Sequence, residues 1–287
     1  MVAYRTRDHS QIPPILYFLV SASFHYLGPA FAVLLFARVD VLGVAWLRIA
    51  SAAAIFALWR RPWRLLLNSA WEQRRLLFAL GTVLAMMNAS FYLAISRLPL
   101  STVGAIEFVG QILLAAIGAR SQRNLWALGF AVAGGGLLSN VRFEGQLIGL
   151  AFALANCVLF MLYIVLGHRI AQDGGSAGID RLATSMLIAF LIIFPIGFSE
   201  AKPAFASAQL LLAGIGVGVC SSVIPYITDQ LAMARLPRAS FALMLCMLPA
   251  LAVVIGAVIL GQVPSGIEMV GILLIMVGVA IHQPVNT

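Results

Sequence analysis

Ionisable side chains interrupt long apolar stretches of this sequence at four places. His25, Arg48, Glu107 and Asp229 each lie inside a run of mainly hydrophobic residues. Placing such a group in hydrocarbon is costly, about 2.5–3.5 kcal/mol at a helix centre on the lower scales. Chains keep these groups where they pair with one another, line a wet cavity or relay protons. The imidazole, the guanidinium and the two carboxylates are therefore candidate binding or coupling groups.

Uncharged polar side chains occur at similar depths in the same kind of segment. Asn88 and Tyr92 are one helical turn apart and share a face. Tyr226 occupies the position equivalent to Asn88 in an internal repeat described below. We expect these groups to line a central cavity that binds a substrate. The full predicted lining consists of His25, Asn88, Tyr92, Glu107, Gln111, Asn156, Tyr163 and Tyr226.

Each of the four ionisable residues also has a purely structural interpretation. Arg48 and Glu107 could neutralise each other and tie two helices together. His25 could be a hydrogen-bonded packing residue between helices. Asp229 could pair with an arginine near the end of its segment. The charge-pair or coupling role of Arg48, Glu107 and Asp229 thus stays open between these alternatives.

The segments that carry these groups are predicted to be membrane-spanning helices. Hydrophobic residues make up 62% of the 287 residues and charged residues only 10%, whereas soluble proteins carry about 25% charge. A spanning helix needs about 20 apolar residues. The ten predicted spans are 13–37, 41–58, 76–96, 98–119, 125–139, 146–167, 182–198, 210–234, 240–260 and 266–281.

The chain contains an internal repeat that is centred on a tripeptide. Arg97-Leu98-Pro99 returns 138 residues later as Arg235-Leu236-Pro237, and 7 of 25 positions around it are identical. After a shift of four residues, Gly129 and Gly136 align with Gly271 and Gly278. We infer two five-helix repeats, 13–139 and 145–281, flanked by a segment at 1–12 and a tail at 282–287.

The distribution of basic residues predicts the orientation of these repeats. With the N-terminus in the cytoplasm, 13 of the 18 basic residues face the cytoplasm, four face outside and Arg48 lies within a span. Because cytoplasmic loops are enriched in Lys and Arg, both termini are predicted to be cytoplasmic. Five is an odd number, so the second repeat must be inserted upside down. Inverted repeats around a site near the midplane are a transporter architecture.

Prolines and glycines divide the spans into two groups. Pro225 and Pro249 fall inside the eighth and ninth spans, where proline removes a backbone donor and is expected to bend the helix. The fifth and tenth spans carry almost no polar groups. They instead carry glycines, which allow close helix approach. We expect those two spans to be packing struts or a homodimer face, away from the cavity.

Several sequence motifs resemble those of the EamA-type transporters of the drug/metabolite transporter superfamily. The resemblance covers nearly the whole chain, including Leu47-Arg48-Ile49, Trp59–Trp63, Phe91-Tyr92, Leu98-Pro99, Ala105-Ile106-Glu107-Phe108, Pro225-Tyr226 and Leu248-Pro249-Ala250-Leu251. Within this superfamily the chain is similar to bacterial exporters of threonine and homoserine or of aromatic amino acids. The chain departs from the family pattern by having Gln111, Leu248 and Gln262 where the family has Pro, Glu and Glu.

The resemblance implies an all-α integral membrane protein with ten transmembrane helices in two inverted five-helix repeats around a central cavity. It implies an exporter of amino acids or related metabolites, placed in the bacterial inner membrane and working by alternating access. The alternative is a proton-coupled exporter of aromatic or quaternary cationic drugs, for which Glu107 and the tyrosines would suffice.

Other functional classes rank below transport. An intramembrane enzyme or a receptor ranks lowest, because the sequence has neither a paired catalytic constellation nor a sizeable domain outside the membrane. No enzymatic activity, cofactor or metal is expected. The expected partners are a small-molecule substrate and the lipid bilayer, but not nucleic acid, because the basic residues fall between apolar segments.

Overall fold

The computed structural model describes residues 13–117, 121–138, 147–245, 247–261 and 265–281. Within these ranges the chain forms helices joined by short connections and contains no strand. The helices are α1 (Pro14–Leu35), α2 (Val41–Arg60), α3 (Pro62–Asn68), α4 (Trp71–Ile95), α5 (Leu100–Ile117), α6 (Gln122–Leu138), α7 (Leu147–Ala171), α8 (Gly175–Phe205), α9 (Ala208–Gly218), α10 (Ile224–Met233), α11 (Arg238–Leu245), α12 (Leu248–Leu260) and α13 (Gly266–Ile281).

Six helical stretches among the described residues are long and apolar enough to cross a membrane. They are α1, α2, α4, α7, α8 and the continuous stretch Ala208–Met233, which contains α9 and α10. The other predicted spans correspond to α5, α6, the pair α11 and α12, and α13. The all-helical membrane fold is therefore confirmed, whereas ten spans in inverted repeats stay a prediction.

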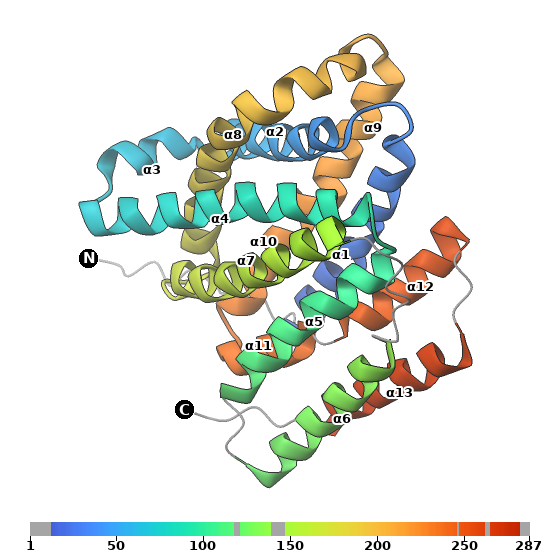
Figure 1. Ribbon diagram of the computed structural model, residues 1–287. Helices are drawn as coiled ribbons and strands as arrows, with labels where there is room; N and C mark the ends of the chain where they lie inside the picture. Colours follow the sequence, from blue (N-terminus) through green and yellow to red (C-terminus); the bar gives the residue numbers. More distant parts are fainter. Residues whose placement is uncertain (1–12, 118–120, 139–146, 246, 262–264, 282–287) are drawn as a thin grey trace, which may run out of the picture.

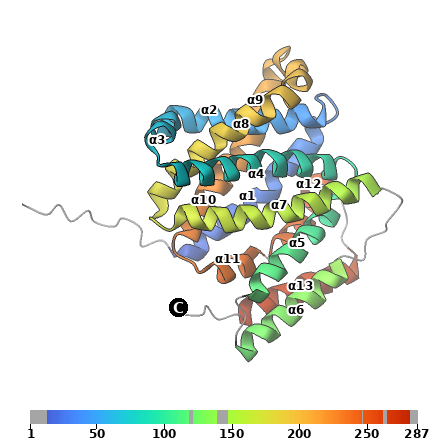
Figure 2. The same ribbon diagram turned by 60° about the vertical axis from the view of Figure 1, so that its left-hand side comes forward.

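The long helices pack into one body, and two shorter helices flank it. α2 packs along α8, α4 contacts both α7 and α8, and α1 contacts α10 (Figure 1). α6 and α13 lie side by side at the edge of the molecule, as both Figure 1 and Figure 2 show. The placement of these two helices outside the core agrees with the absence of mid-depth polar groups from their sequences.

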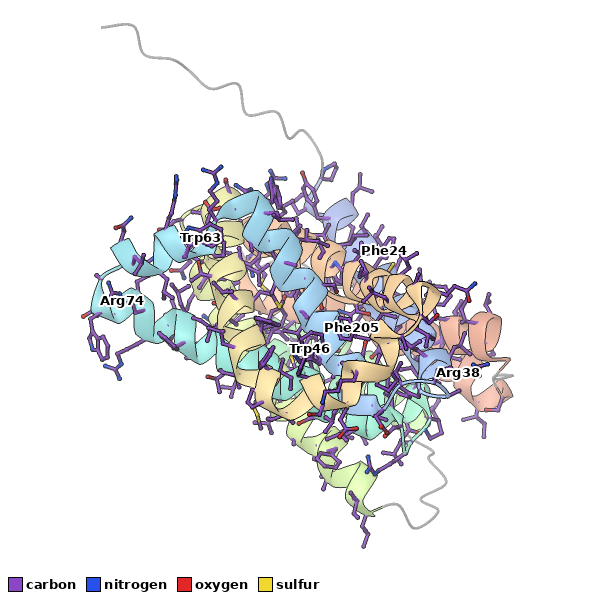
Figure 3. The ribbon with its side chains drawn as sticks, turned by 90° about the horizontal axis from the view of Figure 1, so that it is seen from above. Phe24, Arg38, Trp46, Trp63, Arg74 and Phe205 are labelled. Atoms are coloured by element: carbon purple, nitrogen blue, oxygen red, sulfur yellow. The ribbon has the colours of Figure 1, made fainter. Side chains whose placement is uncertain are left out.

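Aromatic side chains fill the contact between α2 and α8. The Trp46 ring lies 5.3 Å from the Phe198 ring and 6.1 Å from the Phe205 ring, centroid to centroid. Figure 3 shows Trp46 and Phe205 next to each other where the two helices meet. Aromatic pairs at such distances contribute about 0.5–1.5 kcal/mol beyond their burial, so this contact fixes α2 against α8.

Two glycines of α6 do not lie at a close helix contact, although the sequence predicted one there. A side chain added at Gly129 or Gly136 would meet no atom within 4 Å, and both positions are exposed. These two glycines therefore do not let α6 approach its neighbours closely, and the interpretation as packing struts is wrong for them. The glycines of α13, Gly271 and Gly278, are buried. The homodimer face remains a prediction.

The eighth predicted span contains a π-helical segment, Val219–Val223, between α9 and α10. Pro225 lies two residues after the end of this segment and has no backbone N–H to donate to the carbonyl of Ser221, four residues earlier. In membrane helices, local π-helical adjustments can satisfy the backbone groups that a proline leaves free, and π-helical turns often occur at functional sites. The helix irregularity that the sequence predicted at Pro225 is therefore present.

The second predicted helix bend, at Pro249, falls where the ninth predicted span is divided into two helices. α11 ends at Leu245 and α12 begins at Leu248, so Pro249 occupies the first turn of α12, where proline is well tolerated. The Pro249 side chain lies outside the described residues. The same is true of the predicted terminal segments 1–12 and 282–287 and of the junction between the repeats at 139–145.

Candidate functional site

A polar cavity lies between the central helices. Its volume is about 20 Å³, which is room for about one water molecule. Side chains of α1, α2, α4, α5, α7 and α10 surround it, so it lies where the long helices converge. Its lining consists of His25, Arg48, Met87, Asn88, Phe91, Glu107, Asn156, Phe160 and Tyr226.

Arg48 enters the cavity from α2 and is held by the π-helical segment. Its Nε donates to the Ser222 hydroxyl at 2.8 Å, and its Nη2 donates to the Ser221 carbonyl at 2.6 Å. The second bond goes to the carbonyl to which Pro225, four residues later, cannot donate. Nη2 also donates to the Tyr226 hydroxyl at 3.3 Å. The guanidinium is therefore oriented by neutral groups, and its Nη1 takes part in none of these bonds.

Close backbone approach makes this arrangement of Arg48 sterically feasible. A side chain at Gly28 of α1 would come within 2.8 Å of the Ser221 nitrogen. One at Gly218 would come within 2.8 Å of the Arg48 carbonyl oxygen. Real Cβ atoms do not approach other atoms this closely. The two glycines thus allow α1 and α2 to sit directly against the π-helical segment.

Glu107 enters the same cavity from α5 and is held by two other helices. Its Oε2 accepts a hydrogen bond from the Tyr26 hydroxyl at 2.8 Å, and its Oε1 accepts one from Asn156 Nδ2 at 2.5 Å. The residue is only 3% exposed. Its carboxylate therefore joins α1, α5 and α7 while still facing the cavity.

The ion pair between Arg48 and Glu107, which the sequence left open as one alternative, is not present among the described residues. The ion pairs among the described residues are Arg60 with Asp180 and Arg181 with Asp173, and neither includes Arg48 or Glu107. Each partner is instead hydrogen-bonded to neutral groups on other helices. Arg48 and Glu107 thus line one cavity with opposite charges that do not neutralise each other by contact.

Asp229 forms a second polar cluster with α1 and α7. Its Oδ1 accepts from the Ser21 hydroxyl at 2.5 Å and its Oδ2 accepts from the Tyr163 hydroxyl at 2.9 Å. Asp229 is 1% exposed and is absent from the cavity lining. The carboxylate is therefore buried beside the cavity rather than in it.

Five of the eight residues predicted to line the cavity do so, and the other three lie behind it. Tyr92 packs against Arg48, with the guanidinium carbon 5.4 Å from its ring centroid. Tyr163 binds Asp229, as described above. Gln111 is fully buried, and neither atom of its amide has a hydrogen-bond partner among the described residues. None of these three side chains reaches the cavity.

Asn88 and Tyr226 contact each other directly. Asn88 Nδ2 lies 3.3 Å from the Tyr226 hydroxyl oxygen. Both residues line the cavity, as the sequence predicted, but they do not face each other across it. The tyrosine is long enough to bridge the space between its helix and α4, so the pair forms one wall of the cavity.

Four residues of the site were not predicted from the sequence. Tyr26 holds Glu107, while Met87, Phe91 and Phe160 provide apolar walls. Tyr26 carried a signal, because it is a tyrosine beside His25 in the middle of an apolar segment. The three apolar residues carried none, since they resemble any other lipid-facing or core residue in such segments.

Comparison with known proteins shows to which family this chain is related. The chain is 34% identical over 266 residues to the threonine/homoserine exporter RhtA of Salmonella typhimurium strain SL1344, covering 90% of this chain and 87% of that protein. It is 33% identical to RhtA of Escherichia coli K12 over the same shares. The model of the EamA-like transporter family matches residues 147–282.

The chain belongs to the EamA-like transporter family. A solved structure titled only "Crystal structure of protein" has the same fold, with a TM-score of 0.71 over 93% of this chain and 95% of that one. At 17% identity, that likeness shows the fold alone. The predicted membership in this family is thus confirmed, and the chain is a multi-pass membrane transporter rather than a soluble protein.

Proposed function

We propose that this EamA-family protein exports a small amino acid, which it binds as a zwitterion in the central cavity. The observation that carries the proposal is that Arg48 and Glu107 line the same cavity without pairing. A zwitterion carries both charges and no net charge, as the pair does. Both relatives reported above are named as threonine/homoserine exporters, which supports the same substrate class.

The neighbours of the two charges suit the two ends of such a substrate. On the Arg48 side, Nη1 of the guanidinium and the Tyr226 hydroxyl offer donors to a carboxylate. On the Glu107 side, Asn156 Oδ1 has no partner among the described residues and can accept from an ammonium. Charge-assisted hydrogen bonds are roughly twice as strong as neutral ones, so both ends of the substrate would be fixed.

An exporter of aromatic or quaternary cations is the second candidate. Glu107 and the rings of Phe91 and Phe160 in the cavity favour it. Arg48 in the same cavity opposes it, since a guanidinium repels a cationic substrate. Substitution of Arg48 separates the two candidates, because only zwitterion binding requires it.

The proposed mechanism is alternating access by two inverted five-helix halves, with both termini in the cytoplasm of a bacterial cell. The helix pairing supports it. In the proposed repeats, α7 and α10 of the second half are equivalent to α1 and α4 of the first. α4 contacts α7 and α10 contacts α1, so the same contact occurs in both directions between the halves. The remaining equivalent helices pair with each other, α2 with α8 and α6 with α13. Trp63 and Arg74 lie at one end of the molecule and Arg38 at the other (Figure 3), so the Arg-rich segment 59–75 gathers at one end.

A counterflow assay on the purified protein in liposomes tests the proposed function. The liposomes are loaded in turn with each of the twenty amino acids and with a quaternary aromatic cation such as tetraphenylphosphonium. We expect labelled small amino acids to exchange. We expect Arg48→Met and Glu107→Gln each to lower this exchange by about 10–100-fold, because each removes a charged partner of the substrate.

The matched controls change charges that lie outside the cavity. Glu72→Gln and Arg38→Gln alter exposed residues and should leave exchange within about twofold of the wild-type rate. Exchange of the cation, together with its persistence in Arg48→Met, would replace the first candidate by the second. Chemical conversion of a compound without flux would reject transport altogether.

A further inference from the structure

His25 is the one ionisable residue of the cavity that makes no hydrogen bond to another described residue. No hydrogen-bond partner lies near its buried Nδ1, and no bond from Nε2 to a described residue is present. The other polar groups of the cavity form two connected sets, one around Arg48 and one around Glu107. His25 belongs to neither set, although it lines the cavity with them.

The imidazole of His25 is held by aromatic rings rather than by polar groups. Its centroid lies 5.4 Å from that of Phe160 and 5.8 Å from that of Tyr26. A neutral imidazole offers one donor and one acceptor, and a polar group left unpaired in such surroundings costs free energy. The structure thus offers a third polar contact point, separate from the two charged ones.

We propose that His25 binds a hydroxyl group on the side chain of the transported amino acid. This inference rests on the proposed function, in which Arg48 and Glu107 hold the carboxylate and the ammonium. A hydroxyl can donate and accept, so it can pair with either nitrogen of the ring. A charged side chain would add a third charge to a cavity whose two charges already balance those of a zwitterion. The small volume of the cavity favours a short side chain.

The proposal predicts discrimination between amino acids of the same shape. Threonine and valine differ only by a hydroxyl in place of a methyl group. Valine would leave the His25 ring unpaired, and sites built to bind a hydroxyl reject analogues that lack it. We expect wild-type protein in liposomes to exchange threonine at least about tenfold faster than valine at low substrate concentration. Homoserine and norvaline form a second pair that tests the same point.

His25→Leu is the variant that tests the residue itself. It should reduce the threonine-to-valine ratio to about twofold or less, because leucine cannot pair with a hydroxyl. His25→Gln keeps a donor and an acceptor and should restore part of the ratio. His168→Leu is the matched control, because His168 lies near the end of α7, bonds the Leu236 carbonyl at 3.1 Å and does not line the cavity. Its ratio should equal that of the wild type.

A ratio does not depend on how much folded protein is reconstituted, so partial loss of a variant does not obscure the result. Equal exchange of threonine and valine by the wild type would overturn the assignment of His25, as would an unchanged ratio in His25→Leu. In both of those cases amino acids are still transported, and the proposed function stands. Failure of the wild type to exchange any of the twenty amino acids of the counterflow assay would instead reject the proposed function, and this inference with it.

Discussion

The two buried carboxylates of this transporter are held in the same way but face different surroundings. Glu107 accepts hydrogen bonds from Tyr26 of α1 and Asn156 of α7, and Asp229 accepts them from Ser21 of α1 and Tyr163 of α7. Each carboxylate therefore joins the same two helices. Glu107 lines the cavity, whereas Asp229 does not.

The difference lies in what each carboxylate can still bind. The Glu107 set borders open space and includes Asn156 Oδ1, which has no partner among the described residues. Both Asp229 oxygens are occupied by hydroxyl groups at a site that is closed to the cavity. Ser21 and Tyr26 are five residues apart on α1, which places the two sets about 7.5 Å apart along the helix. We infer that the Glu107 set binds the substrate and that the Asp229 set holds the helices together.

The largest expected effect is on transport by Glu107→Gln. An amide cannot supply the charge for the substrate ammonium, so exchange should fall by about 10–100-fold. Because Glu107 does not pair with Arg48, the change leaves no broken ion pair, and the yield of folded protein should stay within about twofold of the wild type. Counterflow and size-exclusion chromatography measure the two quantities. Loss of folded protein with unchanged specific activity would show that Glu107 is structural as well.

The opposite result is expected for Asp229→Ala. Its removal leaves the Ser21 and Tyr163 hydroxyls buried without their acceptor, at a cost of about 1–3 kcal/mol for each unsatisfied group. The protein should unfold at a lower temperature in detergent, while the exchange rate per folded molecule changes less than about threefold. If Asp229→Ala kept wild-type stability but lost transport, Asp229 would be a coupling carboxylate. The distinction between a substrate-binding Glu107 set and a structural Asp229 set would then be wrong.

Smaller effects are expected from two variants that each remove one hydroxyl group, one from the Glu107 set and one from the Asp229 set. Tyr26→Phe takes a donor from Glu107 and Tyr163→Phe takes one from Asp229, each worth about 1 kcal/mol. We expect the first to reduce exchange several-fold and the second to affect mainly thermal stability. Both tyrosines are fully buried, so the two substitutions are matched in size and burial. Equal effects of both variants on transport would argue that the two sets act as one.

The smallest change to the protein is a single cysteine, whose labelling shows which of the two sets lies nearer the cytoplasm. Asn68 and Lys202 are exposed, so single cysteines at these positions should not disturb the protein. With both termini inside, a membrane-impermeant thiol reagent added to whole cells should label residue 202 and leave residue 68 protected. The Asp229 set would then lie on the cytoplasmic side of the Glu107 set. The reverse labelling would invert that order and reject the predicted orientation.

The sequence by itself determined the class of protein and the chemical groups of the site. Low charge and long apolar runs indicated a membrane protein. A protein surface needs few charged residues only where it contacts lipid instead of water. His25, Arg48, Glu107 and Asn156 stood out because polar groups are costly within such segments. Pro225 marked the irregular helix for the same local reason, namely its missing N–H.

Only the tertiary structure decided which of these groups meet. Helical periodicity tells which residues share a face, but it does not give the rotation of that face relative to other helices. The sequence therefore left open whether Arg48 and Glu107 pair. In the structure Arg48 bonds a carbonyl 173 residues away and Glu107 bonds a tyrosine 81 residues away. The same reason explains why Tyr92, Gln111 and Tyr163 were predicted to line a cavity that they do not reach.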